Sequence, residues 1–453
     1  MFENARAAMN AILSSHPWSQ ELASILPLSA LIDFLDVPRT LHTFQLTGNQ
    51  PLWCWPITPS ASRLLLSNKV QDSCNLDRFG ASLNPICLDG RHGDLYHMMS
   101  PETLRLCLES LDSTQIANDH PNMKLKEARI QNLEVVRVSR AKQTSRFGFR
   151  VFFVHSIGWI FFFGLLIMSV ILNCFMMIGF LGALLLSGVV IHFIHGGGPR
   201  KLLVEAGSEY NRVVVSAMHT NETNWKIFYG ESSIVNSLVN RPLSPKRNTN
   251  TTHWSLRYIL RFLIISQWGF AIGAATLKGW DAYFIVFWIS FCAYLFPSEI
   301  TVRRWMEKDA KLELSRYQVQ LSSRRALLNT IMALNPDTFA VDQTTKKDTN
   351  LLFEGALKWI DPILKEGPDR TRWENITRLA MIEARQPSVD TSSHSSGTID
   401  EKHQEVIAAR ALIKSHEKEY WHKYIAEGIE MAANIRRVGH LTGRTAQGQS
   451  SSD

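Results

Sequence analysis

The side chains best suited to bind a metal ion stand at the end of a long apolar run, in the sequence HFIHGGGP. His192 and His195 are three positions apart, which places two imidazoles near one face of a helix. A zinc site needs at least three protein ligands, and no further ligand follows nearby. Interfacial histidines at the end of a membrane helix are therefore the favoured interpretation.

A second group of this kind is His92, Asp94 and His97, in GRHGDLYH. No other motif completes a ligand set around it, so no metal site is predicted there either. The chain also has no Cys-x-x-Cys pair and no His at zinc-finger spacing from a Cys, so we expect reduced and partly buried thiols. The six cysteines are Cys54, Cys74, Cys87, Cys107, Cys174 and Cys292.

The glycine run from Gly196 to Gly198 could suggest a phosphate-binding loop, but it lacks the Lys-Ser/Thr pair of such loops. It also follows an apolar helix rather than a strand, so a hinge is the better interpretation. No nucleophile elbow, metalloprotease helix or kinase signature is present. We therefore predict no catalytic residue and no cofactor, and a non-enzymatic function is favoured over an enzymatic one.

Polar residues inside apolar runs are the remaining candidates, because ions and polar substrates need partners near the bilayer midplane. Only His155 and Gln267 stand out, and His155 lies about one turn inside a basic edge. Gly269 and Gly273 form a G-x-x-x-G motif, which predicts a helix-packing contact within one bundle or between copies. These two glycines are the only site residues that the sequence predicts.

The overall charge of the chain, formally +7, could indicate nucleic-acid binding. Most of the clustered Lys and Arg residues flank apolar runs, however, where orientation in a bilayer accounts for them. The mean hydropathy of −0.06 is that of a soluble protein, so membrane character must lie in local segments. No recognition motif for nucleic acid is present, and the bilayer is the expected partner.

The first membrane segment is the run from Val151 to Ile194, which contains no Asp, Glu, Lys or Arg. A crossing helix needs roughly 20 residues, so the run predicts two spans with a turn near Asn173. Arg150 precedes the run and Arg200 follows it, and basic residues mark the cytosolic side. A hairpin satisfies both ends, whereas one long tilted helix does not.

A second pair of apolar runs starts near Tyr258 and near Asp281, joined by KGWD. Arg257 and Arg261 precede the pair, and Arg303 and Arg304 follow it, so the same hairpin pattern repeats. The fold class expected is therefore a mainly α membrane protein with four transmembrane helices in two hairpins. Both termini would be cytosolic, and the sequence does not distinguish the endoplasmic reticulum from the plasma membrane.

The soluble parts are expected to mix helices and strands before and between the hairpins. SPETLRLCLESLD, with Ser100 as N-cap, predicts a helix, and LEVVRVSRA predicts a strand. Between the hairpins, LLVEAG, NRVVVSAMH and WKIFYG predict strands and ESSIVNSLVN a helix. After the last span, the chain from Thr301 to Pro336 predicts one long helix, followed by shorter helices at LLFEGALKWIDPILKEG and TRWENITRLAMIEA.

These patterns predict eight segments. They are a cytosolic N-terminal domain (1–149), hairpin 1 (150–195), a cytosolic inter-hairpin α+β unit (196–256), hairpin 2 (257–298), a cytosolic helical region (299–385), a flexible linker (386–402), a C-terminal helix (403–437) and a disordered tail (438–453). The apolar spacing of the C-terminal helix favours packing on the preceding helices over binding to the membrane surface.

Four stretches, HTNETNWKIFYGESSIVNSLVNRPL, QWGFAIGAATLKGWDAYFIVFWISFCAYL, RRALLNTIMALNPD and KWIDPILKEGPDRTRWE, carry a resemblance. Over roughly residues 130 to 380, the chain resembles multi-pass membrane proteins that recur, uncharacterised, in filamentous fungi. The resemblance implies the four-span layout and a fungal origin. It implies no catalytic residue.

The preferred hypothesis is a membrane-anchored scaffold or adaptor whose cytosolic parts bind other proteins. The alternatives are an oligomeric channel or transport component, formed by self-association of the chain, and an accessory protein or enzyme of fungal specialised metabolism. Asn221, Asn250 and Asn375 stand in N-x-S/T sequons, and the cytosolic placement predicts that all three stay unglycosylated.

Overall fold

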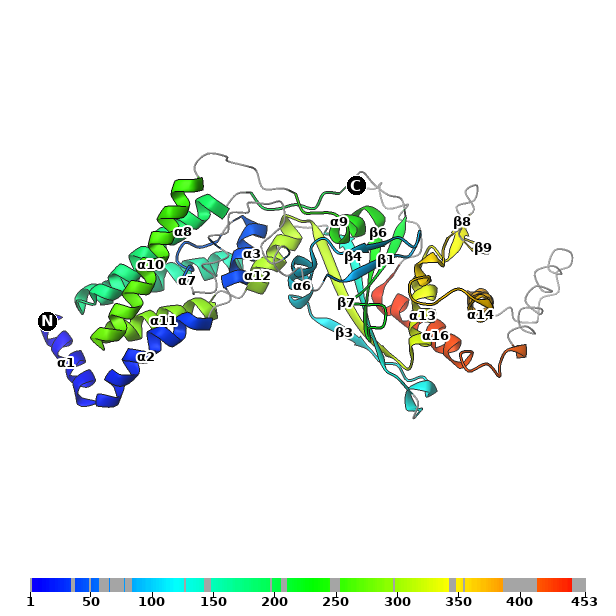
Figure 1. Cartoon of the computed structure of the whole chain (residues 1–453), viewed down its shortest axis with the longest axis horizontal. Coiled ribbons are helices and arrows are strands. Elements are labelled where there is room, and N and C mark those ends of the chain that lie inside the picture. Colours follow the sequence, from blue (N-terminus) through cyan, green and yellow to red (C-terminus); the bar gives the residue numbers. More distant parts are fainter. Residues whose placement is uncertain are drawn as a thin grey trace.

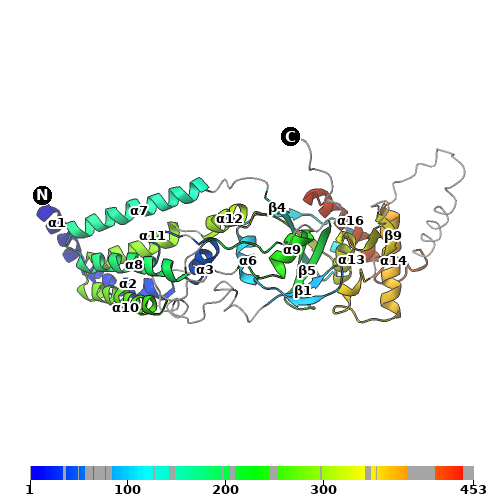
Figure 2. The same cartoon turned by 90° about the horizontal axis from the view of Figure 1, so that it is seen from above.

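A computed structural model of the chain describes residues 2–33, 37–48, 50–56, 65, 77, 84–125, 128–141, 148–195, 198–204, 210–244, 253–295, 298–341, 348–352, 355–385 and 414–441. The molecule is elongated, with a helical bundle at one end and a mixed sheet covered by helices at the other (Figures 1 and 2).

The bundle contains the two predicted pairs of apolar helices. They are α7 (Gly148–Ile171), α8 (Phe175–His195), α10 (His253–Leu277) and α11 (Trp280–Leu295). Three of them are each long and apolar enough to cross a membrane, and α11 reaches that length together with α12 (Ser298–Lys308), at an angle of 41°. The break between α7 and α8 falls at Asn173, which has a φ of 54°, so the predicted turn is confirmed.

The opposite half of the molecule is built on a seven-stranded mixed sheet. In spatial order its strands are β2 (Leu95–His97), β1 (Ile86–Asp89), β5 (Asn211–Ala217), β6 (Asn224–Glu231), β4 (Gln131–Arg140), β7 (Leu312–Leu321) and β3 (Ser113–Ile116). β4 pairs with β6 in parallel and with β7 in antiparallel fashion. The sheet thus draws strands from before, between and after the two pairs of apolar helices, and the fold is mainly α only in the bundle.

Side chains alternate between the two faces of this sheet, as the pleat requires. On β5, Val213 and Val215 enter the core beneath α13 (Arg324–Leu334), α14 (Pro368–Arg385) and α16 (Lys423–Gly439). Val214 enters the core on the other face, with α6 (Pro101–Glu109), α9 (Ser232–Val239) and α12. The strand predictions for β4, β5 and β6 and the helix predictions for α6, α9 and α14 are confirmed.

The N-terminal 149 residues do not form one domain. The first helices are α1 (Phe2–Ser15), α2 (Pro17–Asp33) and α3 (Val37–Thr47). α2 packs on α10 and α11, and buried residues of α2, α3 and the 50–56 segment belong to the same apolar cluster as the membrane helices. Among the described residues of this part, those from Ile86 onward contribute strands to the sheet. The predicted N-terminal domain is therefore wrong, because its first part belongs to the bundle.

The predicted long helix after the last span is also wrong. α12 ends before Lys311, which has a φ of 51°, and the next ten residues pair along the whole of β4 as β7. α13 then begins at Ser323, whose hydroxyl accepts a hydrogen bond from the Ala326 N–H at 3.1 Å. The alternation LELS…YQVQL suits a strand, and pairing with β4 outweighs the helix propensity of these residues.

Three further expectations differ from the structure or lie outside it. Leu202 to Val204, in the predicted strand LLVEAG, are not in a strand. LLFEGALKWIDPILKEG contains only a short 3-10 turn, η2 (Lys358–Ile360), and begins in β9 (Asp348–Leu352), which pairs with β8 (Phe339–Val341). The predicted linker, residues 386–402, lies outside the described residues.

The predicted C-terminal helix (403–437) starts later than expected, because α16 begins at Lys423, residues 416–422 form turns, and residues 403–413 lie outside the described residues. The packing of α16 on α13 and α14 is confirmed. Of the predicted disordered tail (438–453), Val438 and Gly439 belong to α16, and residues 442–453 lie outside the described residues.

Candidate functional site

Residues 50–56, QPLWCWP, enter the bundle without regular structure and place two tryptophans in its core. Trp53 packs edge-on against Trp288 of α11, with ring centroids 6.0 Å apart. Trp55 packs in the same way on Phe44 of α3, at 5.5 Å. The segment therefore fills the space between the membrane helices with aromatic rings.

Two glycines make room for this segment. A Cβ atom on Gly158 of α7 would overlap the indole ring of Trp53. A Cβ on Gly188 of α8 would overlap the carbonyl oxygen of Leu52. Both positions lie inside regular helices, so the glycines serve close approach rather than an unusual backbone conformation.

The polar groups of the segment have partners on the helices. The Gln267 side-chain amide, on α10, donates to Ser187 Oγ at 2.9 Å and to the Trp55 carbonyl oxygen at 3.4 Å. Cys292 Sγ, on α11, donates to the Trp53 carbonyl oxygen at 3.7 Å. Irregular backbone at membrane depth requires such protein partners, because lipid offers none. Gln267 is thus explained by anchoring the segment.

The predicted helix-packing pair Gly269 and Gly273 does not act as a pair within this chain. A Cβ on Gly273 would lie 3.1 Å from Met176 Sδ of α8, whereas one on Gly269 would meet nothing within 4 Å. A closer contact between the same two helices comes from Gly179, where a Cβ would lie 2.5 Å from the Phe270 ring. Within this chain, Gly273 alone lies against another helix, and the predicted contact between copies stays a prediction.

The two histidines at the end of α8 contact α3. His192 lies 5.8 Å from the Phe44 ring, and His195 lies 3.5 Å from the Gln45 amide and 3.4 Å from the Leu65 carbonyl oxygen. Within the described part of the chain, no group of three or more His, Cys, Asp or Glu side chains is placed to hold a metal ion. This includes the group around His92.

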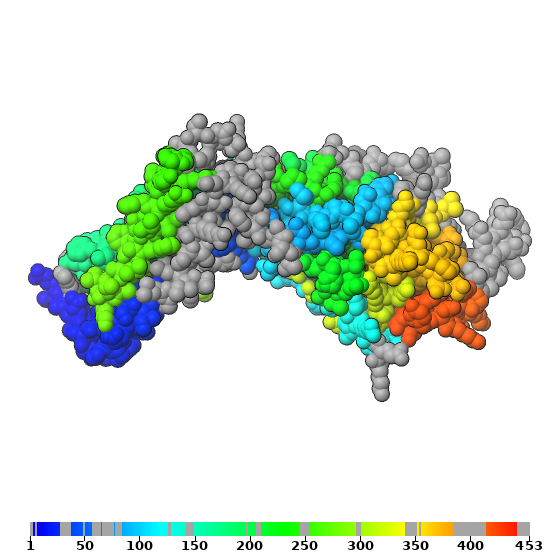
Figure 3. Space-filling view, viewed as in Figure 1, coloured from blue at the N-terminus to red at the C-terminus, as the bar shows by residue number. Residues whose placement is uncertain are grey.

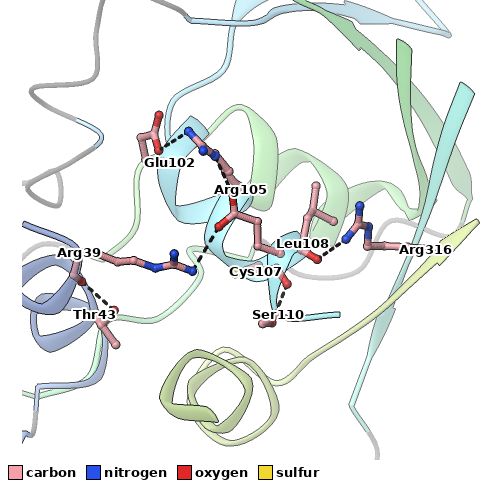
Figure 4. A network of polar contacts seen from close by, with 9 residues as sticks. Arg39, Thr43, Glu102, Arg105, Cys107, Leu108, Ser110 and Arg316 are labelled. Carbon is pink, nitrogen blue, oxygen red and sulfur yellow. Dashed lines mark hydrogen bonds and ion pairs between the residues drawn. The ribbon is translucent and has the colours of Figure 1, made fainter. Parts of the chain in front are cut away.

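Helix α6 is the junction between the bundle and the sheet (Figure 4). Arg39 of α3 contacts Glu109 of α6 at 3.2 Å. At the other end of the junction, Arg316 of β7 donates to the Leu108 carbonyl oxygen at 2.6 Å and pairs with Glu134 of β4, also at 2.6 Å. Cations at the C-terminal end of a helix also interact favourably with its dipole. The junction therefore ties α3, α6 and the sheet together.

A buried His, Thr and Asp lie at the other end of α6. The Thr103 hydroxyl donates to Asp77 at 2.6 Å and lies 2.9 Å from His42 Nε2. Asp77 also accepts the backbone N–H groups of Glu102 and Thr103, which caps the helix. Burial raises the pKa of Asp77 to about 6, against the opposing effect of these hydrogen bonds, and burial together with Arg200 lowers the pKa of His42 to about 3.

This group resembles a catalytic triad in composition but not in exposure. His42 and Thr103 are both buried, with at most 2% of their surface accessible, so a substrate has no access to them. The thiols of the sheet domain are equally enclosed, and burial raises the pKa of Cys87 to about 12. All five described cysteines are buried and free of disulfides, whereas Cys74 lies outside the described residues.

Helix α16 is anchored to the sheet by a buried carboxylate. Glu427 Oε1 accepts from the Asn118 amide at 3.0 Å and from the Ser322 N–H at 2.9 Å. Its other oxygen accepts from the Asn122 amide at 3.0 Å and from the Ser322 hydroxyl. Four donors satisfy the carboxylate, and its removal would leave the Ser322 N–H and one N–H of each Asn amide without their acceptor, while the amides keep the Gln320 and Lys423 carbonyl oxygens.

Between α14 and α16 lies a groove of about 510 Å³. Alanine and isoleucine side chains form its apolar surface, and a Glu from each helix stands beside it. The lining residues are Ala380, Glu383, Ala384, His422, Lys423, Ile425, Ala426, Ile429 and Glu430. Figure 3 shows α14 and α16, in orange and red, on the side of the sheet away from the bundle.

Comparison with protein-family models, with curated proteins and with solved structures finds no match to this chain. The resemblance to fungal membrane proteins therefore stays a prediction. Sequence reasoning missed the groove and the insertion of the 50–56 segment into the helical bundle. The tryptophans at positions 53 and 55, with Pro51 and Pro56 beside them, were the available signal for the segment.

Proposed function

We propose that the protein is a membrane-anchored scaffold or adaptor that binds an amphipathic helix of a partner protein in the groove between α14 and α16. The observation that carries this proposal is the groove itself. It is lined by α14 and α16 together, and α16 is fixed to the sheet through Glu427.

The lining of the groove favours a helix as its occupant. Ala380, Ala384 and Ala426 are small, so a row of larger apolar side chains can approach the two helices closely. Glu383 and Glu430 place acidic groups on both walls. The partner would thus be a helix with an apolar stripe flanked by Lys or Arg residues.

The groove would face the cytosol. β4, β6 and β7 are hydrogen-bonded in one sheet, although one apolar pair separates β4 from β6 and the other separates β6 from β7. Paired strands lie on the same side of a bilayer, so each pair of helices returns the chain to the side that it left. This supports two hairpins, and the basic residues around Arg150, Arg200 and Arg304 support the cytosolic side.

The packing of the bundle supports an anchoring role over a pore through one chain. Trp53 and Trp55 fill the space between the membrane helices, and Gln267 is bonded to the same segment. A conducting path would instead need polar groups along a continuous opening. The described residues also offer no exposed catalytic group that favours an enzyme of specialised metabolism.

A matched pair of substitutions on α16 tests the proposal. Ala426→Trp would place an indole in the groove, whereas Ala433→Trp would place one on an exposed position two turns further along the helix and outside the groove. We expect a partner crosslinked in membranes to copurify with the natural protein and with Ala433→Trp, and to be lost from Ala426→Trp.

The bound region of that partner should also be a helical segment of the kind described. A partner retained by Ala426→Trp would overturn the groove as the binding site. Solute or ion flux through liposomes that contain only this protein would instead favour the channel alternative.

A further inference from the structure

We propose that α2 is a fifth membrane-crossing helix, which places α1 on the opposite side of the bilayer from the sheet. The inference is independent of the groove and concerns the other end of the molecule, where α1 and α2 lie (Figures 1 and 3).

The N-terminal end of α2 lies at the turn between α10 and α11, the point of hairpin 2 farthest from the sheet. Glu21 pairs with Lys278 of that turn at 2.6 Å. The Tyr283 hydroxyl, near the start of α11, donates to the Ser19 carbonyl oxygen at 2.6 Å. The Trp280 indole donates to the carbonyl oxygen of Met9, on α1, at 3.2 Å. These contacts place α1 and the start of α2 at the outer end of the bundle.

The chain that leaves α2 arrives at the sheet. α3, the next helix, contacts Glu109 of α6 through Arg39 and Thr103 of α6 through His42. The Leu46 carbonyl oxygen accepts the Arg200 N–H at 2.8 Å, just beyond the inner end of α8. The chain therefore passes from the outer turn to the sheet side between Ser19 and Arg39.

α2 repeats the layout of α11, the second helix of the predicted hairpin 2, which lies beside it. α11 has 16 residues and α2 has 17, so each is roughly 25 Å long. Both start at the outer turn, and each is followed by a helix at the sheet side, α12 and α3, which pack on each other. Because the two helices are adjacent and similar in length, a bilayer that α11 crosses would also be crossed by α2.

The surface of α2 is apolar on both sides. Ala23 and Pro27 are buried toward the bundle, whereas Trp18, Leu22 and Ile25 point outward with 66%, 41% and 62% of their surface exposed.

The polar residues Gln20 and Glu21 lie near the outer end of the helix, where Glu21 pairs with Lys278. Apolar side chains on both the bundle face and the outward face suit a helix between a bundle and lipid. The helices that α2 packs on, α10 and α11, also expose large apolar side chains such as Ile272 and Phe287, which lipid would cover.

The charges of the N-terminal segment permit this arrangement. α1 carries one acidic and one basic residue, Glu3 and Arg6, so the basic bias that retains a segment in the cytosol is absent. Within α2 the acidic residues are Glu21, near its start, and Asp33, at its end. The proposal replaces the expectation of two cytosolic termini with termini on opposite sides.

Cysteine labelling of the full-length protein in sealed membrane vesicles of one orientation tests the proposal. The background is Cys74→Ser, since the five described cysteines are buried. Ala8→Cys places a thiol on the exposed face of α1, and Asp112→Cys places one on the sheet side, where the Asp112 side chain is fully exposed. A membrane-impermeant maleimide is applied before and after permeabilisation.

We expect opposite results for the two cysteines, with one labelled before permeabilisation and the other only afterwards. Glu3→Cys, also exposed on α1, should behave as Ala8→Cys does. Labelling of α1 and of Asp112→Cys under the same condition would show that both lie on one side, and α2 would then not cross the bilayer.

Discussion

The packing of the 50–56 segment on α8 can be tested by adding a single methyl group at Gly188. Gly188→Ala would drive a Cβ into the Leu52 carbonyl oxygen and would place it 3.0 Å from Trp55 Cδ1. Gly182→Ala, in the same helix, would add the same methyl group where no atom lies within 4 Å. The two variants share helix and chemistry and differ only in the neighbour that the Cβ meets.

The expected difference follows from two opposing effects. Replacement of Gly by Ala inside a helix is favourable by about 1 kcal/mol, and this applies to both sites. Overpacking costs about 1–3 kcal/mol, and this applies only to Gly188, because the backbone of Leu52 cannot rotate away as a flexible side chain could. Gly182→Ala should therefore be neutral or slightly stabilising, and Gly188→Ala should be less stable than Gly182→Ala by about 1–3 kcal/mol.

Two measurements in detergent check this difference. Thermal unfolding should place the midpoint of Gly188→Ala several degrees below that of Gly182→Ala, at roughly 2–4 °C per kcal/mol for a large domain. The second measurement is the rate at which a thiol-alkylating reagent modifies Cys54. This residue is buried in the segment, and its thiol donates to the Pro51 carbonyl oxygen at 3.1 Å. A displaced segment exposes that thiol, so Cys54 of Gly188→Ala should react faster.

Equal midpoints and equal protection of Cys54 in the two variants would refute the reasoning. That result would mean that the 50–56 segment does not rest on α8. The account of Gln267 as its anchor would then fail as well.

Three further predictions concern the sheet domain. Glu427→Leu should lower the free energy of unfolding by about 3–5 kcal/mol, because it leaves buried donors without their acceptor. Glu430→Leu, on the exposed side of α16, is the control and should change that free energy little when both variants are measured by denaturant unfolding. Because the folded-state pKa of Asp77 is raised from 3.8 to about 6, its ionisation opposes folding. Stability should therefore fall as the pH rises from about 4 to about 6, and Asp77→Asn should flatten that part of a stability–pH profile. Asn221 and Asn375, both on the sheet side, should remain unglycosylated. Treatment of the native protein with an endoglycosidase should therefore leave its gel mobility unchanged. A shift in mobility would place the sheet in the lumen.

The sequence by itself determined the elements whose signal is local. α7, α8, α10 and α11 each contain a long apolar run, and the ends of these runs could be predicted from the turn at Asn173 and from flanking Arg residues. Ser100 with Pro101 predicted the start of α6, and the valines of β4 and β5 predicted strands. In each case a window of neighbouring residues contains the physical cause.

Only the tertiary structure decided the remaining features, because their causes lie far away in the chain. β7 is a strand because β4 pairs with it, although its own residues also suit a helix. α2 packs in the bundle although serines, a proline and Glu21 lower the hydropathy of its sequence. In the bundle, Glu21 is paired with Lys278. Trp53 enters the bundle because Gly158 leaves room for its ring. Hydropathy and periodicity describe each residue with its neighbours in sequence, and they cannot report a partner a hundred residues away.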